Sequence, residues 1–180
     1  MSGPGKRYTI WVQGCSRHCD GCMAPDTWPH DGGTLMPIDE LKADILSVRD
    51  IEGITFLGGE PFEQAAAVAE LAGVVRKHGL SVVVFTGYTL VELRRSTDDG
   101  VAALISVADL LIDGHFDRTV FDLSRAWVGS ANQNYHYLTG RYTPEDVVAV
   151  TNQIEVRISP DGRTLINGMG DFEKIKCLLH

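Results

Sequence analysis

Three of the four cysteines of this chain lie within eight residues, inside the stretch GCSRHCDGCMAP. Cys15, Cys19 and Cys22 have C-x3-C-x2-C spacing. In the cytosol thiols stay reduced, so closely spaced cysteines favour a metal site or catalysis over disulfides. A structural zinc ion takes four protein ligands, whereas a [4Fe–4S] cube on three thiolates leaves one iron open to an outside ligand. The spacing therefore indicates either a zinc site that lacks one ligand here or a cluster with an open iron.

A fourth protein ligand would have to come from His18 or Cys177. His18 lies between two of the cysteines, which makes it a poor partner for the same metal. Cys177 stays open as a distant ligand, and otherwise it is a buried or idle thiol.

Three further polar or glycine-rich motifs follow short apolar runs. GGEP (58–61) follows ITFL, TGY (86–88) follows SVVVF, and DGH (113–115) follows the apolar run LLI (110–112). Each motif alone is typical of an ordinary turn. Together they predict a shared site if the runs before them are neighbouring parallel strands.

Apolar periodicity predicts alternating strands and helices that would position these motifs. The expected strands are Tyr8–Val12, Ile54–Leu57, Ser81–Phe85 and Asp109–Ile112. The expected helices are Asp39–Val48, Glu63–His78 and Leu90–Arg95. This order indicates an α/β fold with a parallel sheet, in which ligands gather at the carboxyl ends of the strands. IEVRISPDGRTLING, near the C-terminus, reads as a β-hairpin around Pro160-Asp161-Gly162 that closes or flanks the sheet.

Composition limits the class of protein. The chain has 180 residues, 44% of them hydrophobic, and a net charge of −8. These values favour one globular domain and argue against a protein that binds a nucleic-acid backbone. The absence of a signal peptide and of a run long enough to span a bilayer leads us to expect a cytoplasmic protein without a membrane partner.

The cysteine spacing, followed by GGEP after the next strand, resembles the radical S-adenosylmethionine (SAM) enzymes. Many of them carry an aromatic residue just before the third cysteine, where this chain has Gly21. The small activating enzymes of anaerobic ribonucleotide reductase also tend to have glycine there. Four more segments resemble those enzymes in the same order: GPGKR (3–7), FTGYTLVEL (85–93), LLIDGHF (110–116) and WVGSANQ (127–133). The C-terminal ISPDGRTLINGMGD is similar to the ending of related single-cluster domains.

The resemblance implies a single radical SAM domain over residues 1–180, folded as an α/β partial (βα) barrel of mostly parallel strands. It implies that Cys15, Cys19 and Cys22 hold a catalytic [4Fe–4S] cluster whose fourth iron binds SAM. The reduced cluster would cleave SAM to a 5′-deoxyadenosyl radical, which would take a hydrogen atom from a glycine of a partner enzyme. That partner would be the anaerobic ribonucleotide reductase large subunit or a similar protein, and flavodoxin or ferredoxin would donate the electron.

The resemblance also assigns residues to SAM. The methionyl ammonium would lie against Gly58, Gly59, Glu60 and Pro61, and the Gly21 carbonyl would serve beside the adenine. Candidates for the ribose and the methionyl carboxylate end later strands: Thr86, Gly87, Asp113 and His115. Asn132 and Gln133 are candidates for binding SAM, ordering their loop or presenting the partner's glycine. The alternative for all six is ordinary turn or capping chemistry.

Two other functions stay open at this point. The first is a small radical SAM enzyme that modifies a metabolite or a ribosomal peptide. The second is a zinc or iron–sulfur module without catalysis, which would need a fourth protein ligand and would leave GGEP and TGY unexplained. The hydrogen-atom donor, the fate of SAM and the oligomeric state are not encoded in any motif.

Overall fold

The computed structural model of the chain describes residues 2–162 and 164–170. Its central sheet has the strand order β1-β2-β3-β4-β5. The bounds of these strands are β1 Arg7–Val12, β2 Gly53–Gly58, β3 Ser81–Phe85, β4 Leu110–Asp113 and β5 Asn134–Tyr137. The first four strands are parallel, and β5 pairs antiparallel with β4. The four predicted strands are confirmed.

The sheet is mixed and mostly parallel, as the α/β prediction required, but it is open. Within the described residues β1 and β5 are its two edges. The prediction of an α/β fold is therefore confirmed. The predicted closure into a partial barrel is not seen in the described part of the chain.

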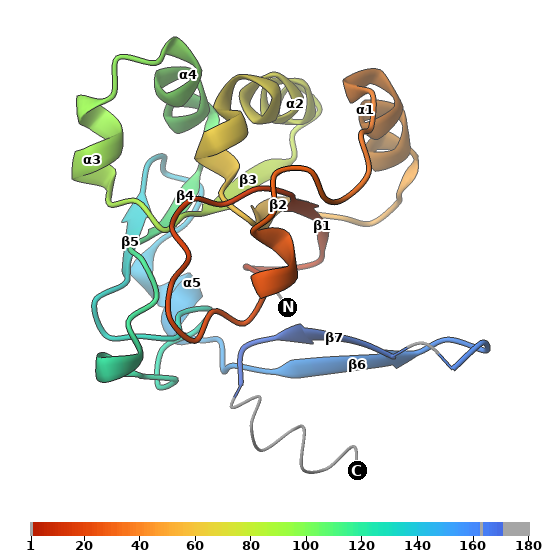
Figure 1. Ribbon diagram of the computed structural model, residues 1–180. Helices are drawn as coiled ribbons and strands as arrows, with labels where there is room; N and C mark the ends of the chain where they lie inside the picture. The colour runs from red at the N-terminus through yellow and green to blue at the C-terminus, as the bar shows by residue number, and fades with distance from the viewer. Residues whose placement is uncertain (1, 163, 171–180) are drawn as a thin grey trace.

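Four helices cover one face of the sheet (Figure 1). They are α1 Ile38–Ser47, α2 Ala65–Lys77, α3 Leu90–Arg95 and α4 Asp99–Val107. The predicted stripe of α2 is buried and consists of Val68, Leu71, Ala72 and Val75. The helix begins two residues later than predicted because Pro61–Gln64 forms a separate 3-10 turn, η2. The longest described helix has 13 residues, and none in the described part combines the length and apolarity needed to cross a membrane.

Successive residues of the strands serve two hydrophobic cores because side chains alternate across a sheet. Val82 and Val84 of β3 face the helices, together with Leu111 of β4. Val83 faces the opposite side, where Trp127 and the short helix α5 (Pro144–Val148) cover it. The polar segment after β4 therefore covers the second face of the sheet.

The C-terminal hairpin is confirmed as two antiparallel strands, β6 (Ile154–Ile158) and β7 (Thr164–Gly168). It forms a sheet of its own instead of extending the central one. Figure 1 shows it below β1, on the side opposite α1 to α4. Cys177 lies outside the described residues.

Arg7, the first residue of β1, bonds to several elements and to the segment before β1, where it donates to the Pro4 carbonyl at 3.1 Å. Its guanidinium donates to Thr55 Oγ1 at 2.7 Å, to Ser81 Oγ at 2.9 Å and to Tyr142 OH at 2.9 Å, and also to backbone carbonyls. Burial lowers the pKa of Arg7, opposed by its interactions with Tyr142. This cation therefore joins the amino ends of three strands to the segment after β5.

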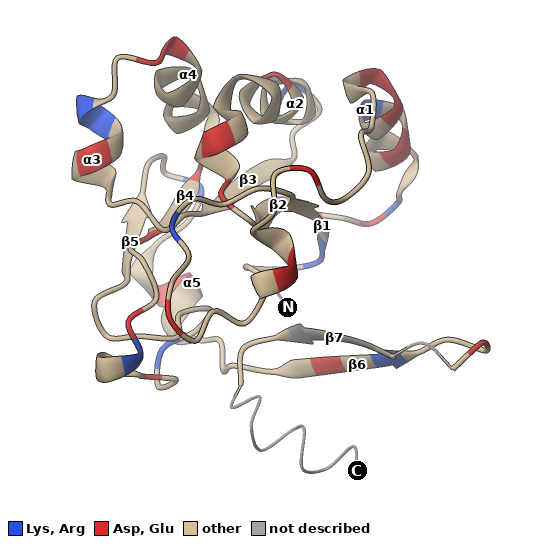
Figure 2. Cartoon of the chain, in the orientation of Figure 1, with Lys and Arg blue, Asp and Glu red and all other residues tan. Residues whose placement is uncertain are grey.

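Charges are spread over the surface. Figure 2 shows acidic residues on each of the helices α1 to α5, not in one tail. The negative charge of the chain thus marks no single region.

Candidate active site

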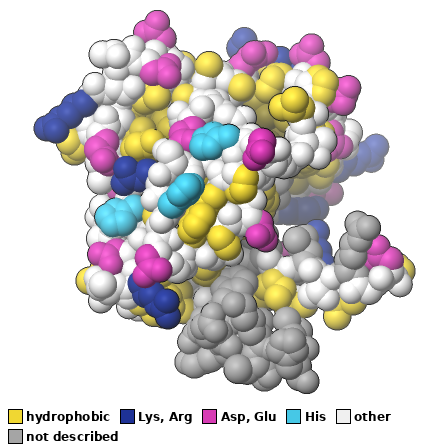
Figure 3. Space-filling view, viewed as in Figure 1, with side chains coloured by type: hydrophobic (Ala, Val, Ile, Leu, Met, Phe, Trp, Pro, Cys, Tyr) yellow, Lys and Arg dark blue, Asp and Glu magenta, His cyan; other side chains and the backbone are white. Residues whose placement is uncertain are grey.

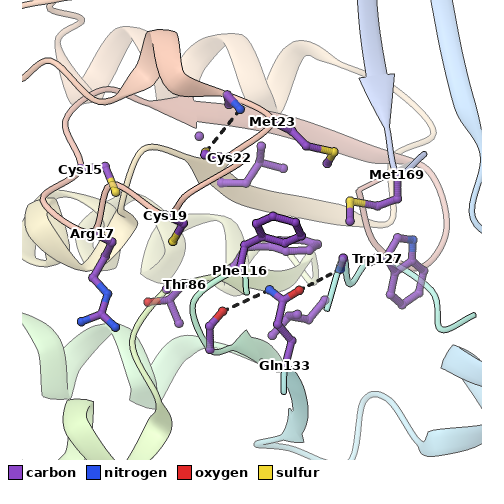
Figure 4. A pocket seen from close by; sticks show the side chains of 18 of the residues that line it. Cys15, Arg17, Cys19, Cys22, Met23, Thr86, Phe116, Trp127, Gln133 and Met169 are labelled. Atoms are coloured by element: carbon purple, nitrogen blue, oxygen red, sulfur yellow. Dashed lines mark hydrogen bonds between the residues drawn. The ribbon is translucent and has the colours of Figure 1, made fainter. Parts of the chain in front are cut away.

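A cavity of about 520 Å³ lies at the carboxyl ends of β1 to β4. Residues from the loops after all four strands line it, including Cys15, Cys19, Gly21, Cys22, Gly58, Gly59, Glu60, Thr86, Gly87 and Gly114. Strand-end motifs far apart in the sequence therefore surround one space, as expected for a parallel sheet. Figure 4 shows the three cysteines on one side of the cavity, with Trp127 and Met169 across from them.

The cysteine loop is clamped at both ends. The amide of Gly14 donates to the carbonyl of Thr27 at 2.8 Å, and that of Cys15 donates to Trp28 at 3.0 Å. Within the loop, the amide of Cys22 donates to the Cys19 carbonyl at 3.0 Å. Cys15 is buried, and Cys19 and Cys22 are partly exposed. The three thiols are thus carried by a loop with fixed ends.

The GGEP segment holds this loop against β2. The amide of Gly59 donates to Val12 and that of Glu60 to Gly14, both at 2.8 Å. A Cβ atom at Gly59 would lie 2.2 Å from the Gly14 carbonyl oxygen, so only glycine permits this approach. Gly58 has φ +111°, which disfavours any side chain. The two glycines are therefore required by the packing of the cysteine loop.

Glu60 is almost fully buried, with 1% of its surface exposed. Its Oε1 accepts from the Phe62 amide at 3.0 Å and the Thr86 hydroxyl at 2.8 Å. Its Oε2 accepts from the Gly87 amide at 2.8 Å, which leaves acceptor capacity on that oxygen. Burial raises the pKa of Glu60 to about 7, although these hydrogen bonds lower it. Thr86 and Gly87 therefore contact the carboxylate and help to line the cavity.

Four predicted site residues do not line the cavity. Pro61 is buried at the start of η2. Asp113 is buried and accepts from the Leu90 amide at 2.6 Å, His136 Nε2 at 2.7 Å and Asn134 Nδ2 at 3.2 Å. Asn132 donates to the His115 carbonyl at 2.9 Å, and both of these side chains are exposed. Contact between these residues and SAM stays a prediction.

Arg17 lines the cavity and was not assigned from the sequence, whereas Gln133 was a candidate and also lines it. Arg17 lies between the first two cysteines, over the Tyr88 ring at 4.7 Å and 3.8 Å from Glu92. Gln133 donates to the Gly114 carbonyl at 3.1 Å and accepts from the Gly129 amide at 2.8 Å. A cation inside the cysteine loop was the available signal for Arg17. Neither spacing nor periodicity tells which polar side chain of a loop faces inward.

The wall across from the cysteines is largely apolar. It includes Phe116, Phe121, Leu123, Trp127 and Met169, and Trp11 and Trp28 also line the cavity. Trp28 stacks on His18 with ring centroids 4.7 Å apart. Figure 3 shows histidines among hydrophobic side chains on the face toward the viewer, and His18, His30 and His115 are all exposed. All three tryptophans thus line the cavity that the thiols share.

Glu63 binds the cysteine loop from the other side. Its Oε1 accepts from the amide of Ser16 at 2.8 Å and from the Ser16 hydroxyl, and its Oε2 lies 2.8 Å from His30 Nε2. Partial burial raises the pKa of Glu63, but the bonds from Ser16 and His30 outweigh it and lower the pKa overall. Glu63 is therefore anionic at neutral pH.

The donor set fits an iron–sulfur cluster. Within residues 2–162 and 164–170, no three His, Cys, Asp or Glu side chains are arranged to hold a single metal ion. A cubane takes each thiolate on a different iron, so its ligands surround a volume instead of a point. Three thiols around one cavity match that requirement.

Comparison with known proteins decides the family. Residues 1–136 match the family described as 4Fe-4S single cluster domain. This chain belongs to that family. The Vibrio cholerae anaerobic ribonucleoside-triphosphate reductase-activating protein is 36% identical over 147 residues, covering 77% of this chain and 92% of that protein. The protein of that name from Escherichia coli K12 is 34% identical over 149 residues, with the same coverage. The one from phage T4 is 27% identical over 139 residues, covering 74% of this chain and 85% of the relative.

The resemblance to small iron–sulfur activating proteins is thereby confirmed. The match to the 4Fe–4S single cluster family contains all three thiols and every predicted strand-end motif. Residues after 136 lie outside that match, yet Gly168, Met169 and Gly170 line the cavity. Part of the wall across from the thiols is thus built by a segment beyond the family domain.

Proposed function

We propose that this protein is a radical SAM activating enzyme that installs a glycyl radical on a partner enzyme. The proposal rests chiefly on one observation: three thiols meet the GGE segment in one cavity of a 4Fe–4S single cluster family member. The names of the relatives support anaerobic ribonucleotide reductase, or an enzyme like it, as the partner.

In this proposal Cys15, Cys19 and Cys22 hold a [4Fe–4S] cluster with one open iron for SAM. When bound, the reduced cluster supplies the electron that cleaves SAM to methionine and a 5′-deoxyadenosyl radical, which takes a hydrogen atom from the partner's glycine. A ferredoxin-type cluster lies near about −400 mV, so flavodoxin or ferredoxin is the proposed electron donor.

The chain's own residues bind and orient SAM. Glu60 offers its remaining acceptor capacity on Oε2 to the methionyl ammonium, in a buried setting where a charge-assisted bond is strong. Gly58 and Gly59 add no side chain that would keep SAM away from the loop. The apolar wall at Trp127 and Met169 excludes water from the radical.

A second target is favoured by one observation. Residues 168–170 line the cavity from outside the family match, which favours a substrate that differs from that of the relatives. The same chemistry on a metabolite or a ribosomal peptide is the alternative.

The proposal is tested under anaerobic conditions. The protein is reconstituted with iron and sulfide, reduced and given SAM, and 5′-deoxyadenosine is measured beside Cys19→Ala and Cys177→Ser. We expect product from the wild type and from Cys177→Ser, and none from Cys19→Ala. Bound zinc without cluster or product, or a site lost in Cys177→Ser, contradicts the proposal. A glycyl radical EPR signal on added anaerobic ribonucleotide reductase then separates the two targets.

A further inference from the structure

Glu63 places a negative charge beside the first cysteine. Its Oε1 accepts from the amide of Ser16, the residue directly after Cys15, at 2.8 Å, and it also accepts from the Ser16 hydroxyl. The side chain of Glu63 is 18% exposed. The charge is thus partly shielded from solvent and joined to the cysteine loop by two hydrogen bonds.

The hydrogen bonds alone do not require a carboxylate. A glutamine carbonyl oxygen would accept the same two bonds from Ser16 without bringing a charge. Among the described residues the only ion-pair partner of Glu63 is His30, which is 64% exposed. The carboxylate therefore keeps a largely uncompensated charge next to the loop.

That charge acts on any redox centre that the loop carries. Adding an electron to a cluster makes it more negative, so a fixed anion nearby disfavours reduction and lowers the potential. Groups around metal ligands tune the metal in this way without touching it.

We propose that Glu63 is a positioning residue that lowers the reduction potential of the cluster held by Cys15, Cys19 and Cys22. This inference rests on the proposed function, because it needs the cluster to be bound. A lower potential makes the reduced cluster a stronger electron donor toward SAM. The same carboxylate fixes Ser16, so one side chain both orders the loop and tunes its cofactor.

The test is a redox titration of the reconstituted protein, followed by EPR and visible absorbance. Glu63→Gln keeps the acceptor and removes the charge. At a fixed solution potential we expect its ratio of reduced to oxidised cluster to rise about tenfold, which is about 59 mV for one electron. The matched control is Glu70→Gln, which removes a charge from an exposed side chain of α2 that pairs with Lys42, and its ratio should stay within about twofold.

Two further variants separate charge from loop structure. Ser16→Ala removes a hydrogen bond and keeps the carboxylate, so its ratio should stay near the wild-type value. His30→Lys sets a permanent cation against Glu63 and should raise the ratio, even if Glu63→Gln loads poorly. The inference is overturned if neither charge variant moves the ratio, or if Ser16→Ala moves it as much as Glu63→Gln.

Iron and sulfide content tells the two levels of failure apart. A wild type without a reducible cluster overturns both the proposed function and this inference. If the wild type binds a normal cluster and the reduction potential is the same in the Glu63 variant, only the inference is overturned.

Discussion

At the scale of single residues, two carboxylates with different surroundings lie at the cysteine loop: Glu60 lines the cavity, and Glu63 bonds to the loop at Ser16. Glu60 is buried among three donors, and its pKa is raised to about 7. Glu63 is bonded to Ser16 and His30, which lower its pKa. Glu60 bonds to residues directly after β3, and Glu63 bonds to the cysteine loop. Their chemistry can therefore be separated by substituting one at a time.

Glu60→Gln should destabilise the apo protein by about 1–3 kcal/mol. In either amide orientation an NH2 group would face a backbone donor, because Phe62 and Gly87 donate to opposite oxygens. Urea unfolding monitored by circular dichroism measures the loss. A variant as stable as the wild type would mean that these bonds do not hold the two strand ends together.

SAM binding should strengthen as the pH rises from about 6 to about 8. The carboxyl of Glu60, with a pKa of about 7, is mostly protonated at the lower end and ionised at the upper end. Only the ionised form offers a negative charge to the ammonium of SAM. Equilibrium binding to the reconstituted protein at several pH values should show this rise, and Glu60→Gln should flatten it. A wild-type profile that is already flat would remove Glu60 from the SAM site.

At the scale of elements, the loop after β1 depends on the loop after β2. The bonds from Gly59 and Glu60 to the cysteine loop are all backbone to backbone. The position of the thiols is thus set by the register of β1 against β2, in which Val12 lies opposite Gly58. A substitution of either glycine should therefore displace the cysteine loop.

Gly59→Ala should weaken cluster loading and destabilise the protein by about 1–3 kcal/mol, since its Cβ would meet the Gly14 carbonyl. Gly73→Ala is the matched control. No atom lies within 4 Å of a Cβ there, and the residue is in α2, so alanine should be neutral or slightly stabilising. Iron content after reconstitution and unfolding free energy are the measurements. Equal loading in both variants would contradict the dependence of one loop on the other.

The sequence predicted the elements with strong periodicity and missed two helices and a strand, α4, α5 and β5. β1 to β4 and the stripe of α2 came from apolar runs and a one-sided pattern. α4 was missed because VAALISVA is apolar at most positions, which hides the stripe of buried Val101 and Leu104 and partly buried Ile105. β5 was missed because NYHY is a short polar edge strand that gains its place by pairing with β4. The expectation that site residues gather at the carboxyl ends of parallel strands correctly placed the cysteines, GGE and TG at one cavity. It could not predict that the Asp113 side chain instead bonds to Leu90 and His136.

At the scale of the whole molecule, the site and the bonds of Arg7 lie at opposite ends of the sheet. The cavity lies at the carboxyl ends of the strands, and Arg7 joins their amino ends. Its partners range from the segment before β1 to Tyr142 after β5. The hairpin β6–β7 then brings Met169 back to the cavity. Residues before and after the sheet thus contribute to both ends of the fold.

Arg7→Gln should cost about 2–4 kcal/mol of unfolding free energy, because several acceptors at least partly buried lose their donor. Arg141→Gln is the control, since Arg141 is exposed and donates to one carbonyl, that of Gly79. Its effect should stay within about 0.5 kcal/mol. The free energy of unfolding of both variants is measured by chemical denaturation. Equal losses of stability would contradict a special role of Arg7 in holding the strands together.

The central claim is that three cysteines hold a cluster with one iron free for SAM. The most direct measurement is the EPR spectrum of the reduced, reconstituted protein before and after SAM is added. We predict a [4Fe–4S]⁺ signal whose g values change with SAM, as expected if SAM binds the open iron. A cluster signal that SAM leaves unchanged would contradict the claim, as would a protein that binds zinc and gives no cluster signal.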